Sequence, residues 1–174
     1  MPEILTSIDI KAPIQRVWDE ITRAGTCRPM FETVYHRVLE AGKPFRYSSA
    51  DGKRTFVFGE FVEIEPPRRL VHTFNSAFDG GKEPETLVTW TLAETAPGVT
   101  RVTLRHERFP TESRTFKGVT KGWAEILEMF RVGIERGTYP FRPRLRNRVM
   151  AAISFMMPGS TLTARLDEKY RRVV

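Results

Sequence analysis

The sequence predicts an α+β fold in which a curved antiparallel sheet of six or seven strands wraps around a long amphipathic helix. Residues 34–108 alternate apolar and polar side chains, with turn signals roughly every 8–12 residues, which is typical of antiparallel strands. Residues 118–136 place large apolar side chains along one helical face. Because that face needs an apolar surface to cover it, the helix and the sheet should share one core.

The composition fits one globular domain. The chain has 174 residues, of which 40% are hydrophobic and 28% charged. Cys27 is its single cysteine, which excludes an intrachain disulfide and a CxxC zinc motif. The N-terminus lacks the pattern of a signal peptide, and no run approaches the roughly 18 apolar residues that span a bilayer. We therefore expect a cytoplasmic protein.

The first predicted elements are a strand and a short helix. Residues 4–12 alternate apolar and polar side chains, which predicts a strand. Pro13 suits the first turn of a helix, where an N–H group is not needed, and Gly25 can end that helix. Apolar residues follow at helical spacing between these two positions: Ile14, Val17, Trp18 and Ile21.

Turn residues divide the middle of the chain into strands. Asp51-Gly52 favours a hairpin because both residues tolerate a positive φ. Pro66-Pro67 should end a strand because proline cannot donate a ladder hydrogen bond. One strand carries Phe45 and Tyr47, and residues 34–40 decide whether the sheet has six or seven strands. The remaining strands are predicted over residues 56–64, 69–75, 86–94 and 101–109.

The second helix carries the longest apolar stripe. Gly137 and Pro140 are expected to end it. The pairs Lys121–Glu125 and Arg131–Glu135 lie one turn apart on the polar face. The stripe consists of Val119, Trp123, Ile126, Leu127, Phe130 and Ile134.

Several segments together resemble the SRPBCC superfamily, and within it the homologues of the activator of the heat-shock-protein-90 ATPase. The resemblance covers about residues 4–137 and divides the chain into a START-like domain (1–137) and a C-terminal extension (138–174). It implies a helix-grip fold. The segments that carry it are APIQRVWDEIT (12–22), GEFVEIEPPRRLVHTF (59–74), TLVTWTL (86–92), TRVTLRH (100–106) and GWAEIL (122–127).

The resemblance also implies a class of function. Family members bind lipids, sterols, polyketides or other hydrophobic molecules in a cavity under the long helix. A minority are enzymes, such as cyclases or hydrolases. The eukaryotic namesake stimulates a chaperone through an additional domain that we do not find in this sequence.

Strand parity predicts which residues face the helix. The inward set is expected to be apolar, apart from three ionisable groups: Glu60, His72 and His106. In residues 56–64, Phe61 on the opposite face weakens the assignment. The inward residues are Phe45 and Tyr47; Phe56, Phe58, Glu60, Val62 and Ile64; Leu70, His72 and Phe74; Val88, Trp90 and Leu92; Val102, Leu104 and His106.

The three inward ionisable groups admit several interpretations. They can anchor a ligand in an apolar pocket. Alternatively they are satisfied within the protein, as a His–Glu pair or as a histidine bonded to Tyr47 or to the backbone. Acid–base catalysis by His72 or His106 is a further alternative, for which the residue types are suitable but the sequence gives no geometry. A Glu/His/His metal site is chemically possible but gains no support from the spacing of ligands on three separate strands.

We therefore predict a protein that binds a small hydrophobic, lipid-like or aromatic ligand between sheet and helix. The alternatives are a cyclase- or hydrolase-type enzyme and a stress-related or co-chaperone-like interaction module. No motif for a nucleotide, metal or other cofactor is present, so we assign no catalytic residue, metal or cofactor. The predicted ligand-binding residues are Tyr47, Phe56, Phe58, Glu60, His72, Phe74, Trp90, His106, Trp123 and Phe130.

The C-terminal extension is strongly basic. Residues 137–174 contain 8 Lys/Arg and 2 Asp/Glu, whereas residues 1–136 contain 20 and 19. Residues 143–157 have the pattern of an amphipathic helix, which Pro158-Gly159 should end. We expect it to pack on the protein itself or on a second copy as a homodimer. A membrane surface is an alternative partner, and nucleic acid is disfavoured because no base-recognition motif accompanies the arginines.

Overall fold

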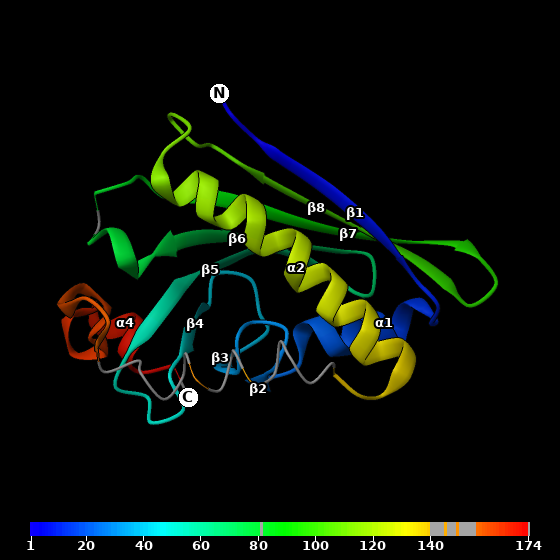
Figure 1. Cartoon of the computed structure of the whole chain (residues 1–174), viewed down its shortest axis with the longest axis horizontal. Helices are drawn as coiled ribbons and strands as arrows, with labels where there is room; N and C mark the ends of the chain where they lie inside the picture. The colour runs from blue at the N-terminus through cyan, green and yellow to red at the C-terminus, as the bar shows by residue number, and fades with distance from the viewer. Residues whose placement is uncertain (81, 140–144, 146–148, 150–155, 174) are drawn as a thin grey trace.

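The computed structural model describes residues 1–80, 82–139, 145, 149 and 156–173. In this part of the chain, one long helix crosses the face of an eight-stranded antiparallel sheet (Figure 1). The strand order is β1-β8-β7-β6-β5-β4-β3-β2. The predicted α+β fold is therefore confirmed.

The strands are β1 (Ile4–Ile10), β2 (Gly25–Cys27), β3 (Thr33–Arg37), β4 (Pro44–Ser48), β5 (Thr55–Glu65), β6 (Arg69–Ser76), β7 (Thr86–Ala96) and β8 (Val99–Glu107). The helices are α1 (Ile14–Thr22), α2 (Arg114–Arg136) and α4 (Glu168–Arg171). The same described residues contain the 3₁₀ turns η1 (Ala77–Asp79), η3 (Gly159–Thr161) and η4 (Thr163–Arg165).

The main differences from the predicted elements are one additional strand and an earlier start of the long helix. The sheet gains β2, which has only three residues and is too short to produce an alternating pattern. Helix α2 begins at Arg114, four residues before the predicted start at Gly118. Ser113 explains the earlier start, because its hydroxyl accepts a hydrogen bond from the Phe116 N–H at 3.1 Å and caps the helix.

The concave face of the sheet has the parity that the sequence predicts on β6, β7 and β8. Leu70, His72 and Phe74 are buried on β6, and each of the next two strands buries its predicted set. Those sets are Val88, Trp90 and Leu92 on β7, and Val102, Leu104 and His106 on β8. Together with the stripe of α2 they form the core.

The parity predicted for β5 is wrong over residues 58–62. Phe61 is the buried residue, at 1% exposure, and its ring lies 5.2 Å from that of Phe45. Phe58 and Glu60 therefore face the convex side, and Val62 is 52% exposed. The sheet register shifts between Phe61 and Glu63, which returns Ile64 to the core side.

Gly59 explains why β5 can curve so closely over its neighbour. A Cβ atom at this position would lie 2.2 Å from the carbonyl oxygen of Thr73 on β6. The adjacent Glu60 N–H donates to the Thr73 hydroxyl at 2.9 Å. Only glycine permits this approach of two backbones.

The C-terminal extension returns to the convex side of β4 and β5. Arg54 Nη1 donates to the carbonyl oxygens of Met157 and Pro158, at 2.9 and 3.1 Å, and to Thr161 Oγ1 at 2.7 Å. Residues 156–173 thus pack on the sheet of their own chain. The predicted helix over residues 143–157 lies almost wholly outside the described residues.

Further along, α4 covers the outward residues of β4 and β5. Lys169 pairs with Glu60, and the rings of Tyr170 and Phe58 lie 4.7 Å apart. Arg46 is buried beneath the same segment and donates to the Val173 carbonyl at 3.3 Å. This cover explains how polar and aromatic side chains of the convex face become buried.

Gly59→Ala should destabilise the protein by about 3 kcal/mol, because the added methyl group overlaps backbone rather than a flexible side chain. Urea unfolding followed by circular dichroism measures the change. Gly118→Ala is the matched control, since no atom lies within 4 Å of the added Cβ atom in α2. That control should stabilise the helix by up to about 1 kcal/mol; equal effects of both substitutions would contradict this account of β5.

Candidate functional site

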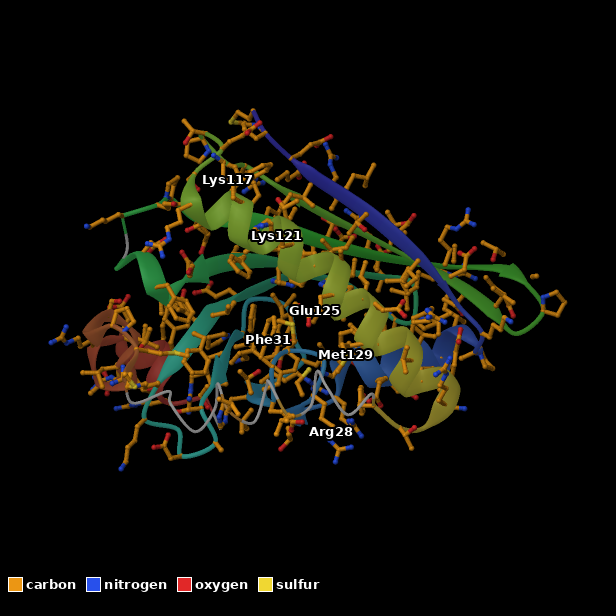
Figure 2. All side chains as sticks on the ribbon, in the orientation of Figure 1. Arg28, Phe31, Lys117, Lys121, Glu125 and Met129 are labelled. Carbon is orange, nitrogen blue, oxygen red and sulfur yellow. The ribbon has the colours of Figure 1, made fainter. Side chains whose placement is uncertain are left out.

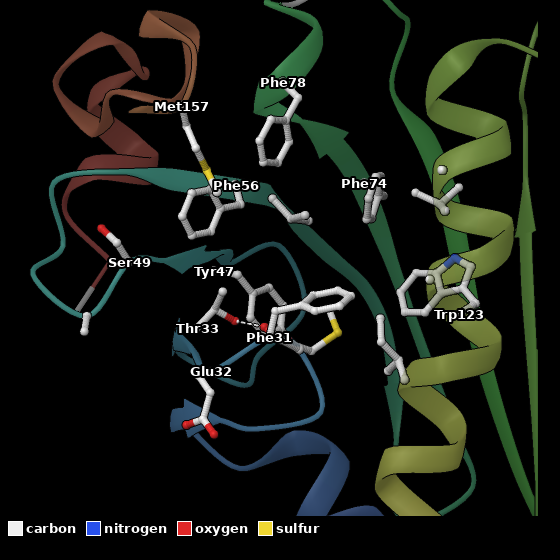
Figure 3. A pocket seen from close by; sticks show the side chains of 17 residues that line it. Phe31, Glu32, Thr33, Tyr47, Ser49, Phe56, Phe74, Phe78, Trp123 and Met157 are labelled. Atoms are coloured by element: carbon white, nitrogen blue, oxygen red, sulfur yellow. Dashed lines mark hydrogen bonds between the residues drawn. The ribbon is translucent and has the colours of Figure 1, made fainter. Parts of the chain in front are cut away.

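A cavity of about 450 Å³ lies between the first half of α2 and the sheet (Figure 3). Its volume falls within the range of about 300–1,000 Å³ that is usual for small-molecule sites. The wall is largely aromatic and aliphatic. The aromatic residues are Phe31, Tyr47, Phe56, Phe74, Phe78 and Trp123, and the aliphatic ones include Met30, Val57, Val119, Ile126 and Met157.

Two glycines on α2 leave room for the cavity. Gly118 and Gly122 lie one turn apart and both line it. A Cβ atom at either position would meet no atom within 4 Å. Because glycine inside a helix is about 1 kcal/mol less favourable than alanine, this pair is an unfavourable choice for the helix alone. It leaves bare backbone where a side chain would fill the cavity.

The predicted site residues divide into three groups. Tyr47, Phe56, Phe74 and Trp123 line the cavity. His72, Trp90, His106 and Phe130 are buried in the core, where three of them border a void of only about 20 Å³ and His106 does not. Phe58 and Glu60 contact the C-terminal segment on the convex face, so their predicted inward orientation is wrong.

Phe56 reaches the cavity through an irregularity at the start of β5. The register of β4 with β5 shifts between Tyr47 and Ser48, so that Val57 pairs with Tyr47 and Thr55 with Ser48. Phe56 is the extra residue, and it lines the cavity together with its neighbour Val57. Its ring stacks on Phe78, with centroids 5.8 Å apart.

The loop between β2 and β3 supplies a side of the mouth that the sequence did not reveal. Met30, Phe31 and Glu32 all line the cavity. Phe31 and Glu32 have φ angles of 61° and 59°, in the left-handed region that side chains disfavour. No glycine or asparagine marks these positions, so the sequence contains no signal for this backbone conformation.

Both inward histidines have their ring nitrogens occupied by protein groups. His72 Nδ1 donates to the Thr73 carbonyl at 2.8 Å, and its Nε2 accepts from Trp90 Nε1 at 3.2 Å. His106 Nδ1 accepts from Trp123 Nε1 at 3.0 Å, and its Nε2 donates to the Thr86 hydroxyl at 2.8 Å. Each imidazole is thus a neutral tautomer with both nitrogens satisfied.

Burial keeps these imidazoles uncharged. Desolvation lowers the pKa of His72 to about 4, and desolvation, with a smaller contribution from the neighbouring His72, lowers the pKa of His106 to about 3. The interpretation of internal satisfaction therefore holds, with tryptophan as the partner rather than Glu60 or Tyr47. Among the residues described, no three potential metal-ligating side chains of the His, Cys, Asp and Glu type gather at one point.

Tyr47 contributes a phenol group to the cavity wall. Its ring stacks on Tyr35 with centroids 4.2 Å apart and an interplanar angle of 7°. Desolvation raises the pKa of Tyr47 well above its ordinary value. The phenol is therefore protonated at neutral pH, and this wall supplies packing surface rather than a base.

A family model described as Activator of Hsp90 ATPase homolog 1-like protein matches residues 11–135. The chain belongs to this family. The match ends before the C-terminal extension, which nevertheless contributes Met157 to the cavity wall. A comparison with curated protein sequences found no match.

Several solved structures share the fold of this chain. The Aha1 dimer from Colwellia psychrerythraea is 17% identical, with 79% of this chain and 99% of that chain covered and a TM-score of 0.65. An HSP90 activator from Plasmodium falciparum is 20% identical, with 79% and 97% covered and a TM-score of 0.64. At these identities the likeness establishes the fold alone.

A third similar structure comes from a biosynthetic locus. DynU16, a protein of the dynemicin biosynthetic locus, is 22% identical, with a TM-score of 0.65. The match covers 79% of this chain but only 48% of DynU16, so the chain spans about half of that protein's length. In the described part of the chain, no helix combines the length and apolarity that a bilayer crossing requires.

The free energy of unfolding should decrease as the pH falls from about 6.5 toward 4. In this window the unfolded histidines bind protons that the folded, neutral imidazoles do not, so acid favours the unfolded state. His72 alone accounts for a loss on the order of 3 kcal/mol over the whole window, of which about 2 kcal/mol falls between pH 7 and pH 5. Urea unfolding at pH 7 and pH 5 measures the loss, and NMR should show the imidazole signals of His72 and His106 unchanged between these pH values. A titration midpoint near 6.5 for either residue would contradict its burial as a neutral group.

Arg54→Ala should loosen the C-terminal segment, because one guanidinium nitrogen joins three of its oxygens to the sheet. Amide hydrogen exchange of residues 156–165 should become at least roughly tenfold faster, which corresponds to local opening of the segment. Arg101→Ala, which removes an exposed ion pair with Asp9 at the opposite end of the sheet, is the control. Equal exchange in both variants would show that Arg54 does not hold this segment.

Proposed function

We propose that this protein binds a small hydrophobic molecule in the cavity between α2 and the sheet. The observation that carries the proposal is the apolar cavity of about 450 Å³, in whose wall Gly118 and Gly122 present bare helix backbone. Ligand affinity would come mainly from burial of apolar surface, at about 25 cal/mol per Å² before the cost of ordering the ligand.

The size of the cavity limits the ligand. An engineered cavity of about 150 Å³ holds one benzene molecule. By that standard the volume of about 450 Å³ suits a molecule of roughly three such rings. Both a fused aromatic system and a folded acyl chain fall within this limit.

The chemistry of the buried histidines favours binding over catalysis. An acid–base role requires a group that can reach the ligand and change protonation near neutral pH. His72 and His106 have both nitrogens engaged, and their pKa values lie near 4 and 3. A cyclase- or hydrolase-type activity through these residues therefore gains no support.

A role as a protein-interaction module takes second place. It rests on the family's description and on the names of two similar structures. The binding proposal, by contrast, rests on a cavity whose lining residues are known. A cytoplasmic location and a homodimer through the extension remain predictions from the sequence.

Gly122→Phe should abolish binding of the neutral fluorescent probe N-phenyl-1-naphthylamine, with at least a roughly tenfold rise in Kd, because the new ring occupies the cavity. Fluorescence titration measures the affinity. Gly122→Ala is the matched control, since a single methyl group leaves most of the volume open. Thermal unfolding should show that both variants remain folded. Undiminished binding in folded Gly122→Phe protein would place the probe elsewhere and refute the proposed site.

A further inference from the structure

Three polar side chains of the cavity wall have hydrogen-bond partners within the protein. Thr33 donates to the Met30 carbonyl, the Ser49 hydroxyl donates to Asp51 and accepts from the Arg54 N–H, and the Trp123 indole donates to His106. A ligand group that needs a hydrogen bond would therefore find few uncommitted donors or acceptors beside them.

The charge at the cavity is negative. Among the described residues that line it, Glu32 is the one with an acidic or basic side chain, and it makes no salt bridge with another described residue. Its carboxylate lies at the rim, outside the group of aromatic rings (Figure 3). An anionic ligand group would meet this carboxylate at the mouth and no counter-charge within the wall.

Among the described residues, the cations that neighbour cavity-lining residues in the sequence do not line the cavity themselves. Lys117 and Lys121 are exposed on α2, beside the two glycines (Figure 2), but neither belongs to the cavity wall. Arg54 is held by the oxygens of residues 157, 158 and 161. These cations therefore offer little compensation for an anion inside the cavity.

We propose that the cavity selects uncharged apolar molecules with the volume of about three rings and rejects anions of the same shape, with Glu32 as the residue that sets this preference. The inference rests on the proposed function and adds the chemical class of the ligand. Any polar group of the ligand would lie at the mouth, where water can solvate it. Free carboxylates, such as those of fatty acids, are excluded from the buried part of the site.

Two probes with the same ring skeleton test the preference. N-phenyl-1-naphthylamine is neutral, whereas 1-anilinonaphthalene-8-sulfonate carries a sulfonate on the same rings. Fluorescence titration of the whole chain should give a Kd at least roughly tenfold higher for the sulfonate, because its charge is desolvated without a partner. Only the signal that Gly122→Phe removes is counted as cavity binding.

Glu32→Gln should strengthen binding of the sulfonate by roughly threefold through loss of like-charge repulsion, while binding of the neutral probe stays unchanged. Glu65→Gln is the matched control, because it removes the same charge from the far end of β5. In that control neither affinity should change.

Several results would overturn the inference. Equal or tighter cavity binding of the sulfonate in the unmodified protein would do so, as would an unchanged preference in Glu32→Gln. Sulfonate binding that disappears in Lys121→Gln would assign the anion to a lysine of α2 instead. Absence of cavity binding by both probes would overturn the proposed function itself, which is a distinct outcome.

Discussion

The attachment of α2 to the sheet at Trp123 is the interaction on which the rest of the site depends. Its indole N–H donates to His106 on β8, and its ring meets the edge of Trp90 at 5.6 Å between centroids. Beyond this point the helix buries its stripe against the sheet, through Ile126, Leu127, Phe130 and Ile134. Before it, Gly118 and Gly122 present bare backbone. The same helix therefore closes the core at one end and opens the cavity at the other.

This arrangement explains why two histidines occur in an apolar core. A buried indole N–H group needs an acceptor, and a neutral imidazole nitrogen provides one without introducing a charge. His72 serves Trp90 in this way, and His106 serves Trp123. The second nitrogen of each imidazole donates a hydrogen bond, from His72 to the Thr73 carbonyl and from His106 to the Thr86 hydroxyl. The inward polar groups thus satisfy the tryptophans of the core and leave the cavity to apolar contacts.

The sequence was sufficient for the fold and for most of the concave face, because alternation is preserved along β6, β7 and β8. It failed on β5, where the alternating set that includes Phe58 and Glu60 is predicted to face the helix, whereas the structure buries Phe61 instead. A register shift at each end of that strand inverts a pattern with a period of two. The partners of the misassigned residues, Lys169 and Tyr170, lie more than 100 residues away and belong to a segment whose docking leaves no local pattern.

One side of the cavity was equally difficult to predict, because its residues depart from the backbone conformation or the helix propensity that the sequence alone would favour. Phe31 and Glu32 adopt a left-handed backbone that costs of order 1–3 kcal/mol per residue. Gly118 and Gly122 each make the helix about 1 kcal/mol less stable than alanine would at the same position. These four residues come from a loop and a helix that are far apart in the sequence, yet all four line the same cavity. Sequences tend to depart from locally favourable choices at functional sites. If this region served only as core, alanine or a larger side chain at the two glycines would stabilise the protein. The two glycines and the strained loop line the same cavity, and we therefore infer that the sequence preserves the cavity.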